Sequence, residues 1–216
     1  QDSSSLPDNQ IWLPFLGDDG NYYFSGNSKA GLIQFNPRTE KFHHFTELKL
    51  TAFLAPVKAG PKKIYIDDTA DGLKLLLMED EPVASTVYDI NGNNISNVES
   101  ILMDNNKLWL GTGNGLVEFD PESRFAKRYD ADDGLQGYSF NRFASLKAST
   151  GEMYFGGQNG FNVFHPEKIS FSSYEPAIIF TDFKLYQESV PIGEDSPLKE
   201  NILMTEELIL HHSQND

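Results

Sequence analysis

Residues 107–125, KLWLGTGNGLVEFDPESRF, contain an aromatic strand, a glycine-rich turn, a second strand and an Asp-Pro end in close succession. The same order of features occurs three more times along the chain. The aromatic residues at the centres of the four copies are separated by 42, 44 and 45 residues, and they are Tyr23, Tyr65, Trp109 and Tyr154. A period in the forties that consists of short strands and turns is typical of a β-propeller with four strands per blade.

A second repeated feature supports this interpretation. A glycine followed by a large apolar residue comes six to eight positions after each aromatic strand, at Gly31-Leu32, Gly72-Leu73, Gly115-Leu116 and Gly160-Phe161. Glycine suits a turn that needs a positive φ angle. Three copies then end on a proline, which cannot donate a ladder hydrogen bond and so terminates a strand. The second copy lacks this proline and is the degenerate one. A β-sandwich would not explain why both features recur together.

The repeat predicts an all-β chain with about four four-stranded blades, at 9–46, 51–90, 95–130 and 138–171, within a propeller portion that spans 1–175. Each copy begins with an inner strand and ends with an outer strand, and no spare strand closes the ring. We therefore expect part of a larger propeller. Its open blade edge would favour pairing with another chain, so self-association as a dimer is also expected.

The repeat stops at Pro176. The segments 177–185 and 207–211 each predict a strand, and polar turns lie between them. Residues 176–216 are therefore expected to be the opening strands of a second, truncated β-domain.

The composition limits the partners. The chain has 17 basic and 32 acidic side chains, a net charge of −15, and no basic cluster suited to a phosphate backbone, so we expect no nucleic acid. It contains no cysteine, which excludes disulfides and a cysteine-based zinc site. The N-terminus lacks the pattern of a signal peptide, which fits either a cytosolic protein or one whose leader lies outside this sequence.

The motifs for enzyme chemistry are weak. His43-His44 and His211-His212 are neighbours in predicted strands, where adjacent side chains point to opposite faces and cannot easily share a metal. Residues 130–134, DADDG, resemble half of a calcium loop, but Asn141 stands where the bidentate glutamate should be, and a turn is favoured. The glycine-rich 111–115 precedes a strand and not the helix that a phosphate loop requires. We expect no catalytic residue, no metal site and no cofactor.

Binding is favoured over catalysis. In an up-and-down blade, the loops from second to third strand and from one blade to the next lie on the same face, near the central channel. Amides, a tyrosine and a guanidinium on these loops suit a neutral or acidic sugar, although polar residues are also common in turns. The candidate ligand-binding residues are Tyr138, Asn141, Arg142, Asn114, Thr112, Gln158, Asn159, Asn27, Lys29 and Asp67 together with its neighbour Asp68.

Three stretches resemble one known family. Residues 95–135 resemble the repeat of the two-component regulator propeller family, 137–169 resemble its last blade, and 176–192 resemble the start of the Ig-like sandwich that follows the propeller. The resemblance covers nearly the whole chain and is weakest over 51–90. It implies the last blades and first sandwich strands of a periplasmic sensor that belongs to an inner-membrane hybrid histidine kinase. Kinase and receiver domains lie outside this chain.

The expected function is therefore extracytoplasmic sensing of an oligosaccharide, without enzymatic activity, in a receptor that signals across the membrane. Two alternatives stay open. A fragment of a polysaccharide-cleaving propeller enzyme would need two carboxylates that converge in the channel. A scaffold for protein partners would be favoured by an apolar channel mouth.

Overall fold

The computed structural model describes residues 5–6, 11–26, 31–51, 53–169 and 178–210. The chain divides into two compact units, of which the first ends at Ile169 and the second begins at Ser170. The sequence placed this boundary after residue 175.

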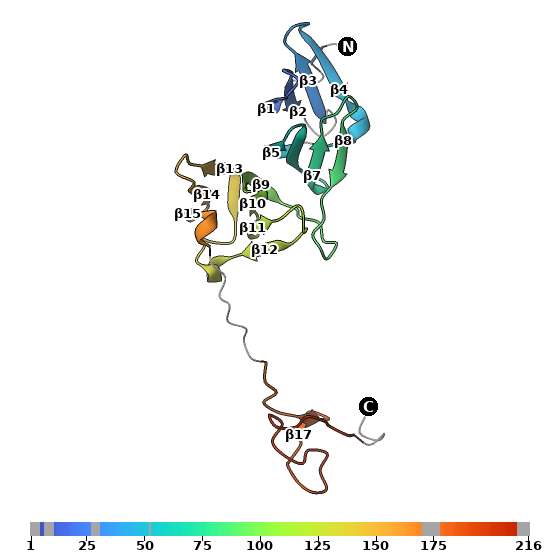
Figure 1. The fold of residues 1–216 in the computed structure, drawn as a ribbon, viewed down its shortest axis with the longest axis vertical. Coiled ribbons are helices and arrows are strands. Elements are labelled where there is room, and N and C mark those ends of the chain that lie inside the picture. Colours follow the sequence, from blue (N-terminus) through green and yellow to red (C-terminus); the bar gives the residue numbers. More distant parts are fainter. Residues whose placement is uncertain (1–4, 7–10, 27–30, 52, 170–177, 211–216) are drawn as a thin grey trace. The chain divides into compact units, whose positions relative to one another are not determined.

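The first unit consists of four antiparallel sheets whose strands follow one another in sequence order (Figure 1). Blade 1 contains β1 (Trp12–Leu16), β2 (Tyr22–Ser25), β3 (Leu32–Asn36) and β4 (Lys41–Phe45). Blade 2 contains β5 (Phe53–Gly60), β6 (Lys63–Asp68), β7 (Gly72–Leu77) and β8 (Val83–Thr86). Blade 3 contains β9 (Val98–Asp104), β10 (Lys107–Thr112), β11 (Gly115–Phe119) and β12 (Ala126–Tyr129). Blade 4 contains β13 (Phe140–Lys147), β14 (Met153–Gly157) and β15 (Gly160–Phe164), and its sheet has three strands among the described residues.

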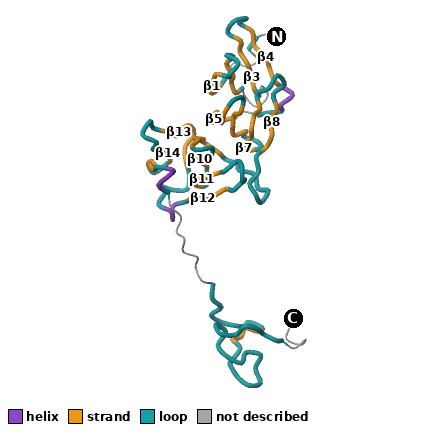
Figure 2. Tube along the Cα trace, in the orientation of Figure 1, coloured by secondary structure: helices purple, strands orange, loops and turns teal. Residues whose placement is uncertain are grey.

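Helical structure is limited to short turns in the described part of the chain (Figure 2). These are three 3₁₀ helices, η1 (Thr46–Leu48), η2 (Ala131–Asp133) and η3 (Pro166–Lys168). The all-β class is confirmed, the four-stranded repeat predicted from the sequence is confirmed in blades 1–3, and the described residues of blade 4 form three strands. None of the described helices is long and apolar enough to cross a membrane.

The hydrophobic core lies between blades. Three clusters of buried side chains each join two consecutive blades, as expected where neighbouring sheets cover each other's faces. In blades 1–3 the central aromatic residue and the apolar residue after the glycine both point toward the next blade. Their side chains are at most 7% exposed, and they are Tyr23, Leu32, Tyr65, Leu73, Trp109 and Leu116. The two repeated features of the sequence are therefore the contacts that stack one blade on the next.

Blade 4 presents the same face without a cover in the first unit. Phe161 occupies the position of Leu32, Leu73 and Leu116, yet it is 65% exposed whereas those leucines are 0–1% exposed. The opposite end of the array is also partly open, because Tyr22 of blade 1 is 42% exposed. Each end of the array of blades thus carries an apolar face.

The repeated glycines have a clear structural role. Gly115 has a φ of 92°, and a Cβ atom there would lie 2.3 Å from the carbonyl oxygen of Tyr129. Gly72 has a φ of 78°, and its Cβ would lie 2.5 Å from the carbonyl oxygen of Ile95. Positive φ and close backbone approach are the two conditions that select glycine, so the sequence prediction for these turns is confirmed.

The second unit contains little regular structure in residues 178–210. Its two strands, β16 (Lys184–Leu185) and β17 (Glu188–Ser189), form a small hairpin. The strand expected over 177–185 is wrong in extent, since only its last two described residues are strand and residue 177 lies outside the described residues. The strand expected over 207–211 is also absent at 207–210, and 211 lies outside the described residues. The start of an Ig-like sandwich therefore stays a prediction.

Candidate functional site

The first strands of the four blades lie side by side on the inner edge of the array, as Figure 1 shows for β1, β5, β9 and β13. Among the candidate residues, Arg142 on β13 makes the clearest contact at this inner edge. Its Nε donates a hydrogen bond of 2.9 Å to Oε2 of Glu99 on β9. This ion pair joins blades 3 and 4. Glu99 was not among the residues predicted from the sequence, although an acidic residue between two apolar parts of a strand is a signal that could have identified it.

Asp67 lies close to this pair, at the end of β6, and only 4% of it is exposed. Its Oδ1 is buried and has no hydrogen-bond partner. Burial raises the pKa of Asp67 to about 7, the N–H of Val98 acts in the opposite direction, and the negative charge of Glu99 raises the pKa further. The sequence placed Asp67 in an accessible loop, whereas the structure places it between blades 2 and 3.

Asp68 and Thr112 occupy the same position in consecutive repeats and serve the turns that follow them. Asp68 is 1% exposed, and its carboxylate accepts hydrogen bonds from the N–H groups of Thr51 and Ala70. The buried hydroxyl of Thr112 donates to the carbonyl of Gly115 at 2.7 Å and accepts from the N–H of Asn114 at 3.0 Å. The side chains of Asp68 and Thr112 therefore use their oxygen atoms in hydrogen bonds that stabilise the backbone around these turns.

The other predicted residues remain accessible in the described structure. Exposed side chains in this group are Tyr138, Asn141, Asn114, Gln158 and Asn159. Asn159 is fixed by Gln136, whose Oε1 accepts from its N–H at 2.9 Å. Asn27 and Lys29 lie outside the described residues. The structure brings Arg142 and Asp67 into one electrostatic environment, and a ligand role for any of these residues stays a prediction.

A cavity of about 330 Å³ lies along the first strands of all four blades. It is lined by Leu13, Pro14, Phe15, Ala55, Pro56, Ser100, Ile101, Phe143 and Ser145. Because one lining segment comes from each blade, the cavity marks the central channel of the array. None of these residues was among the sequence candidates.

The backbone around this cavity is irregular. The pairing of β1, β5 and β13 with their neighbours shifts register, which indicates a bulge in each strand. Leu13, Ala55 and Phe143, which lie in the three bulges, have φ angles of 50°, 50° and 58°. Non-glycine residues adopt this left-handed conformation at a cost, and such residues cluster at functional sites.

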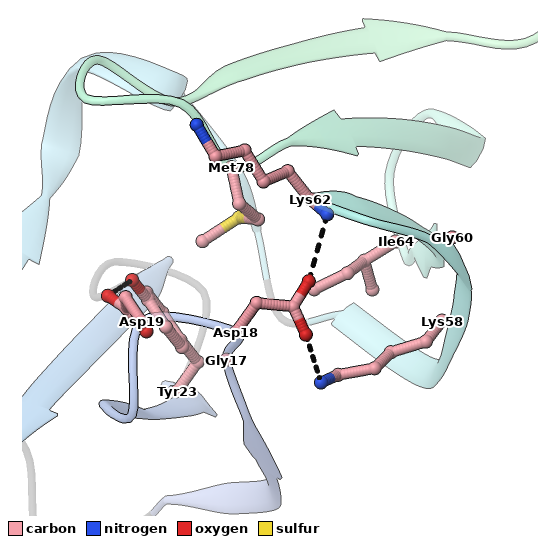
Figure 3. Close-up of a pocket in the computed structure, with 9 residues that line it drawn as sticks. All are labelled: Gly17, Asp18, Asp19, Tyr23, Lys58, Gly60, Lys62, Ile64 and Met78. Carbon is pink, nitrogen blue, oxygen red and sulfur yellow. Dashed lines mark hydrogen bonds and ion pairs between the residues drawn. The ribbon is translucent and has the colours of Figure 1, made fainter.

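A second, smaller crevice lies between blades 1 and 2, where the first turns of the two blades meet (Figure 3). Its volume is about 160 Å³, which is below the range of about 300–1,000 Å³ that is usual for small-molecule pockets. Asp18 spans the crevice, because Oδ1 accepts from Nζ of Lys58 at 3.0 Å and Oδ2 accepts from the N–H of Lys62 at 3.0 Å. The Lys62 N–H and then the Lys58 ammonium hold the pKa of Asp18 below its usual value. The contacts of Asp18 therefore connect blades 1 and 2, and we call the Asp18–Lys58 pair an Asp–Lys joint.

The same joint occurs once more. Nζ of Lys147 in blade 4 donates to Oδ1 of Asp104 in blade 3 at 2.7 Å. Asp18 and Asp104 both stand five residues before the central aromatic of their blade, and Lys58 and Lys147 stand seven residues before theirs. The Asp–Lys joint is therefore a repeated feature, and alignment of the copies could have found it.

The segment that resembles half of a calcium loop forms η2. Asp130 accepts a hydrogen bond from the N–H of Asp132, and the Asp133 carboxylate accepts from the N–H of Asp130. These carboxylates cap a 3₁₀ turn, as the sequence favoured. Within the described residues no group of three or more histidine and acidic side chains is arranged to hold a metal ion.

The raised pKa of Asp67 beside Glu99 is of the kind that general acids in glycosidases have. A general acid must reach the leaving-group oxygen of its substrate, however. Asp67 is 4% exposed and lies within the packing of two blades, so this pair is poorly placed for hydrolysis.

Comparisons with known proteins found similarity to a histidine kinase and to solved extracellular domains. No model of a known protein family matches the chain. Over 125 residues, 57% of the chain, it is 38% identical to histidine kinase P4 of Formosa agariphila. Two solved structures from B. thetaiotaomicron, both described as extracellular domains of hybrid two-component systems, have TM-scores of 0.59 and 0.58 at 18% and 19% identity, and 77% and 94% of the chain is covered.

The chain is similar to two-component sensors. The resemblance noted in the sequence is thereby confirmed, and the structural matches confirm the propeller-like fold. The chain spans 9% of the length of the Formosa histidine kinase and 22% and 26% of the two B. thetaiotaomicron structures. A gluconolactonase from Xanthomonas campestris has a TM-score of 0.53 at 10% identity. Its likeness concerns the fold alone, and propellers carry both binding and catalytic functions.

Proposed function

We propose that this chain is an extracytoplasmic, non-catalytic portion of a hybrid two-component sensor kinase, and that it takes part in detecting an oligosaccharide. The observation that carries the proposal is the joint occurrence of two matches. A stretch covering more than half of the chain is related to a histidine kinase, and the fold is that of extracellular domains of hybrid two-component systems. The structural matches support a location outside the cytoplasm, and the proposal adds that the parent receptor is anchored in the inner membrane.

The inner edge of the blades supports ligand binding as the sensing step. It combines a cavity of about 330 Å³ with the exposed Arg142 and Asn141. Apolar walls beside a few polar groups are usual in ligand sites, and an amide and a guanidinium suit sugar hydroxyls. Signalling would require that the ligand bind two conformational states of the receptor with different affinity, and we propose that this receptor is a dimer.

Titration calorimetry of the ectodomain against a panel of oligosaccharides tests the proposal. We expect one class of glycan to bind and to activate a transcriptional reporter that depends on the receptor. Binding to no member of the panel, combined with normal signalling in cells, would contradict it. Glycan cleavage by the purified chain would favour the enzyme alternative instead.

A further inference from the structure

We propose that the cavity lined by the first strands of the four blades, which we name the channel cavity, holds an uncharged sugar ring. This inference rests on the proposed function and specifies where the oligosaccharide binds and which chemistry it presents. The volume of about 330 Å³ lies at the lower end of the usual range for small-ligand pockets, so it suits one ring and not an extended chain.

The lining determines the chemical class. It consists of leucine, isoleucine, proline, alanine, phenylalanine and two serines, and the described residues that line it include no charged side chain. A carboxylate or sulfate in such a site would lose its hydration without gaining a counter-charge, which is strongly unfavourable. A pyranose ring has apolar C–H faces that can pack against Phe15, Phe143 and the two prolines, as sugars do on aromatic surfaces.

The hydroxyls of a sugar also need polar partners, and the cavity supplies them. Ser145 of β13 lines the cavity and is only partly buried, so its hydroxyl can reach a ligand there. The hydroxyl of Ser100 cannot, because it is buried beside Gly111. In addition, β1, β5, β9 and β13 each pair with one neighbouring strand only. Their free edges carry backbone donors and acceptors.

The bulges add a third, independent observation. Leu13, Ala55 and Phe143 keep left-handed backbone angles at matching places in three blades. A bulge next to a site changes the direction of a side chain and leaves a residue unpaired in the ladder. Because all three residues line the cavity, the strain is concentrated where the ligand would sit.

The charged residues next to the cavity agree with an uncharged ligand. Glu99 and Arg142 directly precede the lining residues Ser100 and Phe143, and they neutralise each other at 2.9 Å. An acidic sugar would have to displace Glu99 from Arg142 and would also face the net charge of −15. A neutral ring meets neither obstacle.

The test is binding of defined probes to the 216-residue chain, measured by calorimetry and by protein NMR shifts. The probes are three neutral disaccharides (cellobiose, maltose and mannobiose) and, as the charged probe, digalacturonate. Ala55→Trp should fill the channel cavity and weaken binding of the neutral probe by at least about tenfold. Val83→Trp on β8, where Val83 is 53% exposed, is the matched control and should bind as the parent does.

Ser145→Ala provides a second variant that does not enlarge any side chain. It should fold normally, because Ser145 is only partly buried, and the loss of its hydroxyl should weaken binding several-fold. Binding of digalacturonate in preference to the neutral probes overturns the inference. Binding of the neutral probes that is unchanged in both Ala55→Trp and Ser145→Ala overturns it too but leaves the proposed function intact, since the sugar then binds elsewhere. Cavity-dependent binding of an apolar peptide in place of any sugar would assign the cavity to a protein partner and overturn both.

Discussion

The three junctions between blades are not built alike. Junctions 1–2 and 3–4 each contain an Asp–Lys joint at the outer end of the first strands, formed by Asp18 with Lys58 and by Asp104 with Lys147. At junction 2–3 the corresponding positions are Gly60 and Leu102, which cannot form an ion pair.

Junction 2–3 instead buries its charge. Asp67 lies inside the interface, and on the outside Arg124 of blade 3 donates to the carbonyls of Tyr88 at 3.1 Å and Asp89 at 2.7 Å. In blade 1 the repeat position of Asp67 is held by Ser25, whose Oγ accepts from the N–H of Phe53 at 3.0 Å without any charge. The same repeat position thus places a neutral hydroxyl, that of Ser25, in junction 1–2 and a buried carboxyl group, that of Asp67, in junction 2–3. The comparison teaches that similar blades can be joined with different sensitivity to pH and salt.

The largest effect is expected from the apolar contacts that all junctions share. Trp109→Ala should remove about 3–5 kcal/mol from the free energy of unfolding, because Trp109 is 2% exposed within the cluster of junction 3–4. Tyr154 occupies the same repeat position on the uncovered face of blade 4, and Tyr154→Ala is the matched control. Urea unfolding followed by intrinsic fluorescence should give a loss of about 1 kcal/mol for Tyr154→Ala. Equal losses would mean that the face of blade 4 is covered after all.

An intermediate effect is expected at Asp67. Its pKa is about 7 in the folded chain, against a usual value near 4. Between these values the folded chain holds a proton that the unfolded chain has lost, so the free energy of unfolding should fall as pH rises from about 4 to about 7 and then level off. Asp67→Ser, which copies the hydroxyl of blade 1, should remove this slope and stabilise the chain by about 2 kcal/mol at pH 7.5.

The measurement is urea unfolding of both proteins at several pH values, with hydrogen exchange of the Val98 amide as a local probe of junction 2–3. Since other carboxyls also titrate, the difference between the parent and Asp67→Ser is the decisive quantity. A difference that does not change with pH would contradict the assignment of a protonated, buried acid to this junction.

The smallest effect is expected from the Asp–Lys joints. Asp104→Asn should cost about 0.5–1 kcal/mol, because the pair with Lys147 is partly exposed and solvent weakens such pairs. The loss should shrink in about 0.5 M NaCl as salt screens the charges. Asp18→Asn should change stability in the same direction. A loss at either joint that is insensitive to salt would point to the hydrogen bonds and not to the charges.

Much of the fold was predictable because the contacts that stack the blades repeat in the sequence. The aromatic strand and the Gly-Leu pair recur together, and each is buried for a reason common to all copies. The bulges were not predictable in this way. Leu13, Ala55 and Phe143 carry none of the glycine or asparagine signals that mark positive φ, so packing and not local preference imposes their conformation.

The candidate site was predicted in part. The topology placed Arg142 and Asn141 near the channel, where the structure has them exposed. Asp67 and Thr112 were assigned to accessible loops because they end their strands, yet side chains at strand ends between two blades still alternate toward the interface and become buried. The channel cavity escaped notice because its lining is apolar, and apolar residues in a strand are normally attributed to the core.

The open face at Phe161 has a practical consequence for handling this chain. Repeat arrays stay in solution when the outermost unit turns a polar surface to water, whereas blade 4 offers an aromatic side chain that is 65% exposed. Purified alone, the chain should bind hydrophobic dyes and adhere to chromatography resins. A polar replacement at this one position is the natural first step toward well-behaved crystals.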